Sequence, residues 1–143
     1  MTVNLTFMVL DQIIPQHTPS NLSERFEAEW IGEHTLGSFL LKPSHIPWVV
    51  FVPKHPLTPD NAAHIYPLLY ELSDWLSEQG LGIHNNIAKL GNVLPYCHIH
   101  LVMRTPQDEC WPNPIWGQTL TPCLTPDKAQ RIDLIRQFLS THS

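Results

Sequence analysis

The sequence is poor in basic residues. Its 143 residues include eight Lys or Arg against thirteen Asp or Glu, which gives a formal net charge of −5. A general nucleic-acid-binding surface requires clustered Lys and Arg to displace the counterions of the phosphate backbone, and this composition argues against one. A small phosphate-bearing ligand stays possible, because a pocket can favour anions locally while the whole chain is acidic.

The sequence also lacks a long apolar run and a basic leader. No stretch approaches the roughly 20 apolar residues of a membrane-spanning helix, and residues 1–10 contain no basic residue. The three cysteines, Cys97, Cys110 and Cys123, match neither a disulfide framework nor a zinc ribbon in their spacing. We therefore expect a cytoplasmic protein with free thiols.

Proline and histidine are abundant instead, at fourteen and nine residues. Because Pro is confined to turns, strand edges and the first turns of helices, its count predicts a loop-rich chain. The length allows a core of its own, and we expect one domain over residues 1–143.

Two helices are predicted. The first begins at Thr58, which can cap it, has Pro59 at its first position and ends at Gly80. Its apolar positions recur at helical spacing: Ala62, Ile65, Tyr66, Leu69, Leu72 and Leu76. The second spans residues 125–140, with Thr125 as its cap and Pro126 at the first position.

The other periodic segments predict strands. We expect a hairpin over residues 25–42 that turns at 32–34, a buried strand at 47–53, and strands at about 81–88 and 97–104. Strands around one long central helix, with a second helix at the C-terminal end, indicate an α+β fold on an antiparallel sheet.

Turns and loops are predicted between these segments. Residues 7–10 are ambiguous between strand and helix, residues 17–21 form a turn by composition, and Leu90-Gly91-Asn92 joins the last two strands. A loop rich in Pro and Trp runs over residues 106–122.

One strand carries reactive side chains, in the segment Tyr96-Cys97-His98-Ile99-His100. Alternation places Tyr96, His98 and His100 on one face and the apolar residues on the other. A neutral imidazole is a competent nucleophile near pH 7 when a hydrogen bond to its other nitrogen fixes the tautomer. A second imidazole can stabilise phosphoryl charge or assist the leaving group. His98 and His100 are therefore the candidate catalytic residues.

The surrounding segment, Gly91-Asn92-Val93-Leu94-Pro95-Tyr96-Cys97-His98-Ile99-His100-Leu101-Val102, resembles the signature of the histidine-triad family. In that signature three histidines alternate with apolar residues after a Gly-Gln pair. Two other segments, Pro47-Trp48-Val49-Val50-Phe51-Val52-Pro53 and Trp111-Pro112-Asn113-Pro114-Ile115-Trp116-Gly117, resemble a bacterial branch that often lacks the first histidine. The resemblance covers about residues 36–120.

The resemblance implies a five-stranded antiparallel sheet with two helices, paired as a homodimer. It also implies a reaction without a bound metal or other cofactor. The middle histidine, which falls on His98, attacks the α-phosphate of a nucleoside phosphoramidate or a dinucleoside polyphosphate such as a diadenosine polyphosphate. A nucleotidyl-histidine forms, and water then releases the mononucleotide. The third histidine of the triad falls on His100.

The sequence departs from the family pattern at four positions. Tyr96 replaces the first histidine of the triad, and Trp48 stands where many members have a histidine. Asn92 replaces the glutamine of the Gly-Gln pair, and Lys42 falls where others have a ribose-contacting asparagine, where it can bind phosphate instead. The alternative function is therefore a catalytically impaired nucleotide-binding or scaffold protein that keeps the fold.

Asn86 and Trp116 complete the candidate substrate contacts, with Tyr96, Asn92 and Lys42. Four of these five have a structural alternative: the two asparagines can cap turns, Trp116 can pack under the last helix, and Lys42 can be an ordinary exposed charge. A zinc site is the alternative for the two histidines, although we expect no metal. It would require a third ligand, for which the plausible donors are His84, His45 and His55.

Overall fold

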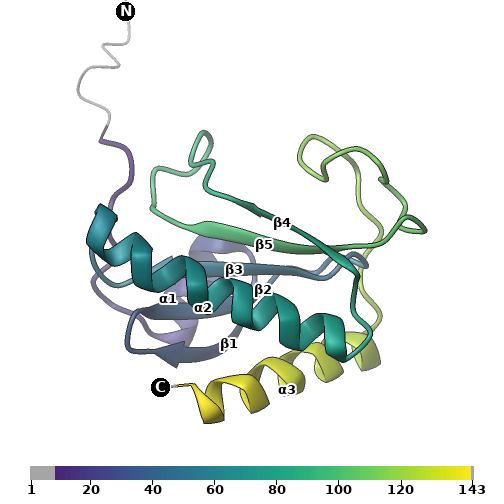
Figure 1. The fold of residues 1–143 in the computed structure, drawn as a ribbon. Coiled ribbons are helices and arrows are strands. Elements are labelled where there is room, and N and C mark those ends of the chain that lie inside the picture. Colours follow the sequence, from purple (N-terminus) through teal and green to yellow (C-terminus); the bar gives the residue numbers. More distant parts are fainter. Residues whose placement is uncertain (1–8, 143) are drawn as a thin grey trace, which may run out of the picture.

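The computed structural model describes residues 9–142, which form a five-stranded sheet with three helices (Figure 1). The strands are β1 (Glu29–His34), β2 (Gly37–Leu41), β3 (Trp48–Pro53), β4 (His84–Ala88) and β5 (Ile99–Arg104). The helices are α1 (Pro19–Phe26), α2 (Pro59–Glu78) and α3 (Thr125–Thr141). The spatial strand order is β1-β2-β3-β5-β4, and neighbouring strands are antiparallel. The predicted α+β class is confirmed.

The N-terminal part differs from the prediction, because α1 occupies residues assigned to a turn and to the hairpin. Thr18 caps this helix: its Oγ1 accepts a hydrogen bond from the backbone N–H of Asn21 at 3.3 Å, and Pro19 begins the first turn. Phe26 therefore belongs to the helix and not to a strand. Of the ambiguous segment 7–10, residues 7 and 8 lie outside the described residues, while Val9 and Leu10 are exposed and outside any strand.

The hairpin is shorter at its start and turns later than predicted. β1 begins at Glu29, a bulge between Trp30 and Gly32 shifts its register, and the chain turns at residues 35–36. The predicted turn at residues 32–34 is wrong, because the bulge lets the strand continue past Gly32.

The helix and strand boundaries elsewhere follow the prediction with small corrections. Thr58 caps α2 as expected, with its Oγ1 accepting from the backbone N–H of Asn61 at 3.1 Å. In α3, Thr125 lies inside the helix, and the capping position is Leu124, which makes no side-chain capping bond. β4 and β5 begin later than predicted, at His84 and Ile99.

The helices cover the two faces of the sheet unequally (Figure 1). α2 crosses one face, α3 packs beside it, and together they bury the larger apolar core, in which Phe39, Phe51 and Leu72 are fully enclosed. α1 covers part of the opposite face through Leu22 and Phe26. Within residues 9–142, none of the helices combines the length and hydropathy that a membrane crossing requires.

The alternation along β5 gives this strand two different faces. Ile99, Leu101 and Met103 belong to the core under α2. Successive side chains of a strand point to opposite faces, so His100 points away from that core. His98, directly before the strand, packs against Phe26 on the same face as His100. The packing of the core therefore fixes the direction in which the histidines point.

Candidate functional site

A cavity of about 460 Å³ lies on the face of β3 and β5 that is turned away from α2. Side chains of these two strands form its floor, and its walls come from the end of α1, from the loop after β4 and from the loop after β5. The lining residues are Phe26, Lys42, Trp48, Val50, Leu90, Gly91, Asn92, Val93, Leu94, His98, His100, Trp116 and Gly117. The cavity thus joins the two histidines to a mostly apolar enclosure with one cation.

His98 is held in the tautomer that a nucleophile requires. Its Nδ1 lies 2.6 Å from the backbone carbonyl oxygen of Tyr96. A carbonyl can only accept, so Nδ1 carries the hydrogen and the lone pair is on Nε2. Burial lowers the pKa of His98, against the opposing effect of the Tyr96 carbonyl, and so favours the neutral ring. The ring also packs against Phe26 of α1, with 5.0 Å between centroids.

His100 is held in the opposite tautomer. The indole Nε1–H of Trp48 donates to its Nδ1 at 3.0 Å, so in the neutral ring the hydrogen is on Nε2. Burial lowers the pKa of His100 to about 3, and the nearby charges of His98 and Lys42 act in the same direction. The His98 and His100 rings lie 4.8 Å apart between centroids. The pair therefore offers one Nε2 lone pair and one Nε2–H donor side by side.

Three of the predicted substrate contacts line the same cavity. Lys42 supplies its positive charge: its Nζ donates to the carbonyl of Phe26 at 2.7 Å and lies 5.3 Å from the Trp48 ring centroid. Burial lowers the pKa of Lys42, and Glu27 opposes that effect. Asn92 lies on the exposed loop after β4, and Trp116 places its ring 5.5 Å from that of His100.

Two predicted contacts, Tyr96 and Asn86, do not line this cavity. The hydroxyl of Tyr96 accepts a hydrogen bond from Nη1 of Arg25 at 2.6 Å, and its ring faces a separate hollow beside α1. The Oδ1 of Asn86 accepts from Nη1 of Arg104 at 2.9 Å. Phe26, which sequence reasoning placed in the hairpin, lines the cavity in their stead.

The zinc alternative has no third ligand in the described part of the chain. Within residues 9–142, no group of three or more His, Cys, Asp or Glu side chains is arranged to hold a metal ion. None of the three suggested donors lines the cavity. His84, for example, lies edge-on to Trp111 with 6.1 Å between ring centroids.

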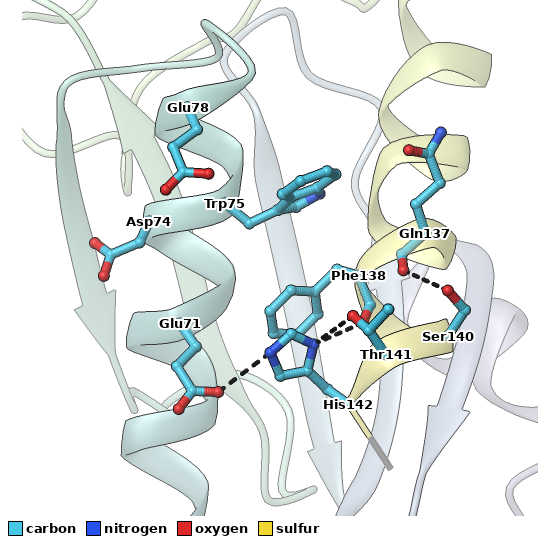
Figure 2. Close-up of a pocket in the computed structure, with 9 residues that line it drawn as sticks. All are labelled: Glu71, Asp74, Trp75, Glu78, Gln137, Phe138, Ser140, Thr141 and His142. Atoms are coloured by element: carbon cyan, nitrogen blue, oxygen red, sulfur yellow. Dashed lines mark hydrogen bonds and ion pairs between the residues drawn. The ribbon is translucent and has the colours of Figure 1, made fainter.

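A larger hollow of about 590 Å³ lies elsewhere, between α2 and α3 (Figure 2). Glu71, Asp74 and Glu78 line its α2 side. On the α3 side, the ring of His142 stacks on Phe138, and its Nε2 lies 3.5 Å from a carboxylate oxygen of Glu71. The hollow contains neither histidine of the pair. The candidate site is therefore the smaller cavity, because it contains His98 and His100.

The comparisons with known proteins point to one family. No protein-family model matches the chain, and no curated protein matches it. Among solved structures, it is similar to a histidine-triad protein of Bradyrhizobium japonicum, with 26% identity, a TM-score of 0.75, and 88% of this chain and 99% of the other covered. A histidine-triad protein of Marinobacter aquaeolei has 26% identity and a TM-score of 0.75, over 90% and 98% of the two chains.

A histidine-triad protein of Sinorhizobium meliloti shares the fold, with 23% identity and a TM-score of 0.71 over 94% of this chain and 98% of the other. The sheet order, the two histidines at the start of β5 and the two likenesses at 26% identity agree with one another. The likenesses at 26% identity therefore support the identification of the chain as a histidine-triad protein.

Proposed function

We propose that the protein is a nucleotide hydrolase or transferase that cleaves its substrate at the α-phosphate through a covalent His98 intermediate. The likeness to histidine-triad proteins supports a nucleotide hydrolase or transferase kind of function. The substrate class we propose is a nucleoside phosphoramidate or a dinucleoside polyphosphate. The observation that carries the proposal is the pair of opposite tautomers on one cavity floor, His98 with a free Nε2 lone pair and His100 with an Nε2–H.

In the first step the Nε2 of His98 attacks the α-phosphorus. The new N–P bond forms as the bond from phosphorus to the leaving nitrogen or oxygen breaks, and the leaving group takes that electron pair. The imidazole gains positive charge while its Nδ1–H stays hydrogen-bonded to the carbonyl of Tyr96, which stabilises that charge. Water then attacks phosphorus, the N–P bond breaks, and the mononucleotide and neutral His98 are released. The leaving group takes up a proton from solvent in the first step, and the attacking water returns one to solvent in the second.

The other groups of the cavity stabilise and hold the phosphate. His100, with its pKa of about 3, stays neutral at pH 7 and donates its Nε2–H to a phosphoryl oxygen without transferring the proton. Lys42 offsets the phosphate charge. Asn92 and Trp116 line the cavity, and we expect them to contact the nucleoside, one by hydrogen bonding and one by its aromatic face. Tyr96 acts on this step through its backbone carbonyl.

The experiment is turnover of an adenosine phosphoramidate and several dinucleoside polyphosphates, with a chelator present, by the wild type and His98→Asn. We expect turnover by the wild type and its loss in the variant, with binding of adenosine monophosphate nearly unchanged. Acid quenching during turnover should trap a nucleotidyl adduct on the wild type only. Equal turnover by both proteins would refute the role of His98.

The second candidate is a non-catalytic nucleotide-binding or scaffold protein of the same fold. The observation that favours it is Tyr96, which is bonded to Arg25 and leaves the first triad position without an imidazole. This candidate predicts nucleotide binding without turnover in both the wild type and His98→Asn.

We further propose a homodimer that acts in the cytoplasm, as the family resemblance implies. Light scattering of the purified chain at micromolar concentration tests the dimer, which is refuted by a mass near 16.4 kDa.

A further inference from the structure

Arg104, the last residue of β5, is buried with all three of its guanidinium nitrogens in hydrogen bonds. It is 2% exposed. Its Nε and Nη2 donate to the two carboxylate oxygens of Asp108, at 2.7 and 3.0 Å. Its Nη1 donates to Oδ1 of Asn86 on β4 at 2.9 Å, and its Nη2 also donates to the backbone carbonyl of Asn113 at 2.8 Å. Arg104 thus connects the sheet to the loop after β5 at two residues, Asp108 and Asn113.

Asp108 organises the start of the same loop. Its Oδ1 accepts from the backbone N–H groups of Cys110 and Trp111, at 3.0 and 2.8 Å, and its Oδ2 accepts from that of Thr105 at 3.3 Å. The bond to Arg104 and these backbone donors hold the pKa of Asp108 below its ordinary value, against the effect of burial. The carboxylate therefore stays charged and paired while the chain bends around it.

The loop continues from this anchor to the wall of the cavity. Cys110 and Ile115 are buried against Val102 of β5 and against Ile46. The next residue is Trp116, whose ring reaches His100, and it lines the cavity with Gly117. Only three residues of sequence separate Asn113, whose carbonyl Arg104 binds, from Trp116.

We propose that Asn86 and Arg104 are positioning residues that set the place of Trp116 over the histidine pair. Asn86 orients the guanidinium of Arg104 through one hydrogen bond. Arg104 in turn binds the loop at Asp108 and Asn113, and the position of that loop determines where the indole of Trp116 lies. Asn86 therefore acts on a bound nucleotide through Trp116 and not by contact. Its effect on binding rests on the proposed function, whereas its effect on the position of the indole does not.

Asn85 provides a matched control on the same strand. It is the same residue type, next in the chain, and its Nδ2 donates to Ser73 of α2 at 2.8 Å on the opposite face of the sheet. Asn85→Ala and Asn86→Ala both remove one side-chain amide from β4, and only the second removes a partner of Arg104. Asn86→Asp keeps an acceptor oxygen for the guanidinium and serves as the conservative rescue.

The first measurement is ¹⁹F NMR of the folded chain labelled with 5-fluorotryptophan, with the Trp116 signal assigned by Trp116→Phe. We expect Asn86→Ala to shift or broaden this signal, and Asn85→Ala and Asn86→Asp to leave it near the wild-type position. Binding of adenosine monophosphate, measured by calorimetry, should weaken about fivefold in Asn86→Ala only. An unmoved Trp116 signal in Asn86→Ala would overturn the proposal.

A double-mutant cycle separates positioning from contact. If Asn86 acts through the indole, adding Asn86→Ala to Trp116→Ala causes no further loss of nucleotide affinity. An additional fivefold loss in the double variant would instead make Asn86 a direct contact and refute the proposal. Should the wild type bind no nucleotide while the ¹⁹F shift persists, the proposed function fails and the positioning role stands.

Discussion

His100 is buried in its neutral form, and acid should therefore destabilise the protein through this residue. Its pKa is about 3 in the folded chain, against about 6.5 for an unperturbed histidine. Between these values the unfolded chain binds a proton that the folded chain does not, so stability falls as the pH drops below 6.5. Linkage gives a loss of about 2 kcal/mol between pH 7 and pH 5 from His100 alone. Any folded pKa below about 4 gives nearly the same figure.

Urea unfolding at pH 7, 6 and 5 tests this reasoning in three proteins: the wild type, His100→Asn and His64→Asn. His64 is an exposed histidine of α2, and its variant controls for the loss of an imidazole outside the cavity. His98 and His17, whose pKa values are also lowered by burial, contribute to all three proteins. His100→Asn should lose about 2 kcal/mol less than the wild type between pH 7 and pH 5. An equal loss in both would show that folded His100 takes up the proton.

Three further predictions concern single side chains. Trp48→Phe leaves Nδ1 of buried His100 without its donor, and urea unfolding should show a loss of about 1–2 kcal/mol. Lys42→Gln removes the cation of the cavity, and calorimetry should show about tenfold weaker binding of adenosine monophosphate, whereas an unchanged affinity would place the phosphate elsewhere. Arg131→Met leaves two carbonyls between β2 and β3 unpaired, and should lower the free energy of unfolding by about 2–4 kcal/mol.

The long helix and the central strands could be predicted from the sequence, because their signals are local and agree with one another. Thr58, Pro59 and the apolar spacing all indicate the same helix. The same start signal precedes α1 and could have identified it: Thr18-Pro19-Ser20-Asn21 matches Thr58-Pro59-Asp60-Asn61. In both helices the Thr Oγ1 accepts from the Asn backbone, and the Asn Nδ2 donates to a carbonyl five residues earlier. Alternation over residues 26–31 concealed this signal.

The positions of Tyr96 and Asn86 could not be predicted, because both depend on where strand pairing begins. Alternation places Tyr96 on the same face as His98, and both rings do pack against Phe26, but it does not show where strand pairing begins. β5 begins at Ile99, and Tyr96 forms an isolated bridge with Gln12. Asn86 pairs with Val102 of β5, and its side chain accepts a hydrogen bond from Arg104 and does not line the cavity. Register of this kind is set by tertiary contacts and not by local sequence.

The two-sided character of β5 also bears on how such a protein can diverge. Substitutions at positions 98 and 100 change the cavity and leave the core under α2 intact, whereas substitutions at 99, 101 and 103 do the reverse. Selection can therefore alter the cavity and the packing of the core under α2 nearly independently on one strand. The loop segment 90–94 can also vary in length. Such a change would reshape one wall of the cavity without altering which face of the sheet each residue of β5 points to. A single-residue insertion within β5 would turn the following side chains to the opposite face and disrupt both the cavity and the core.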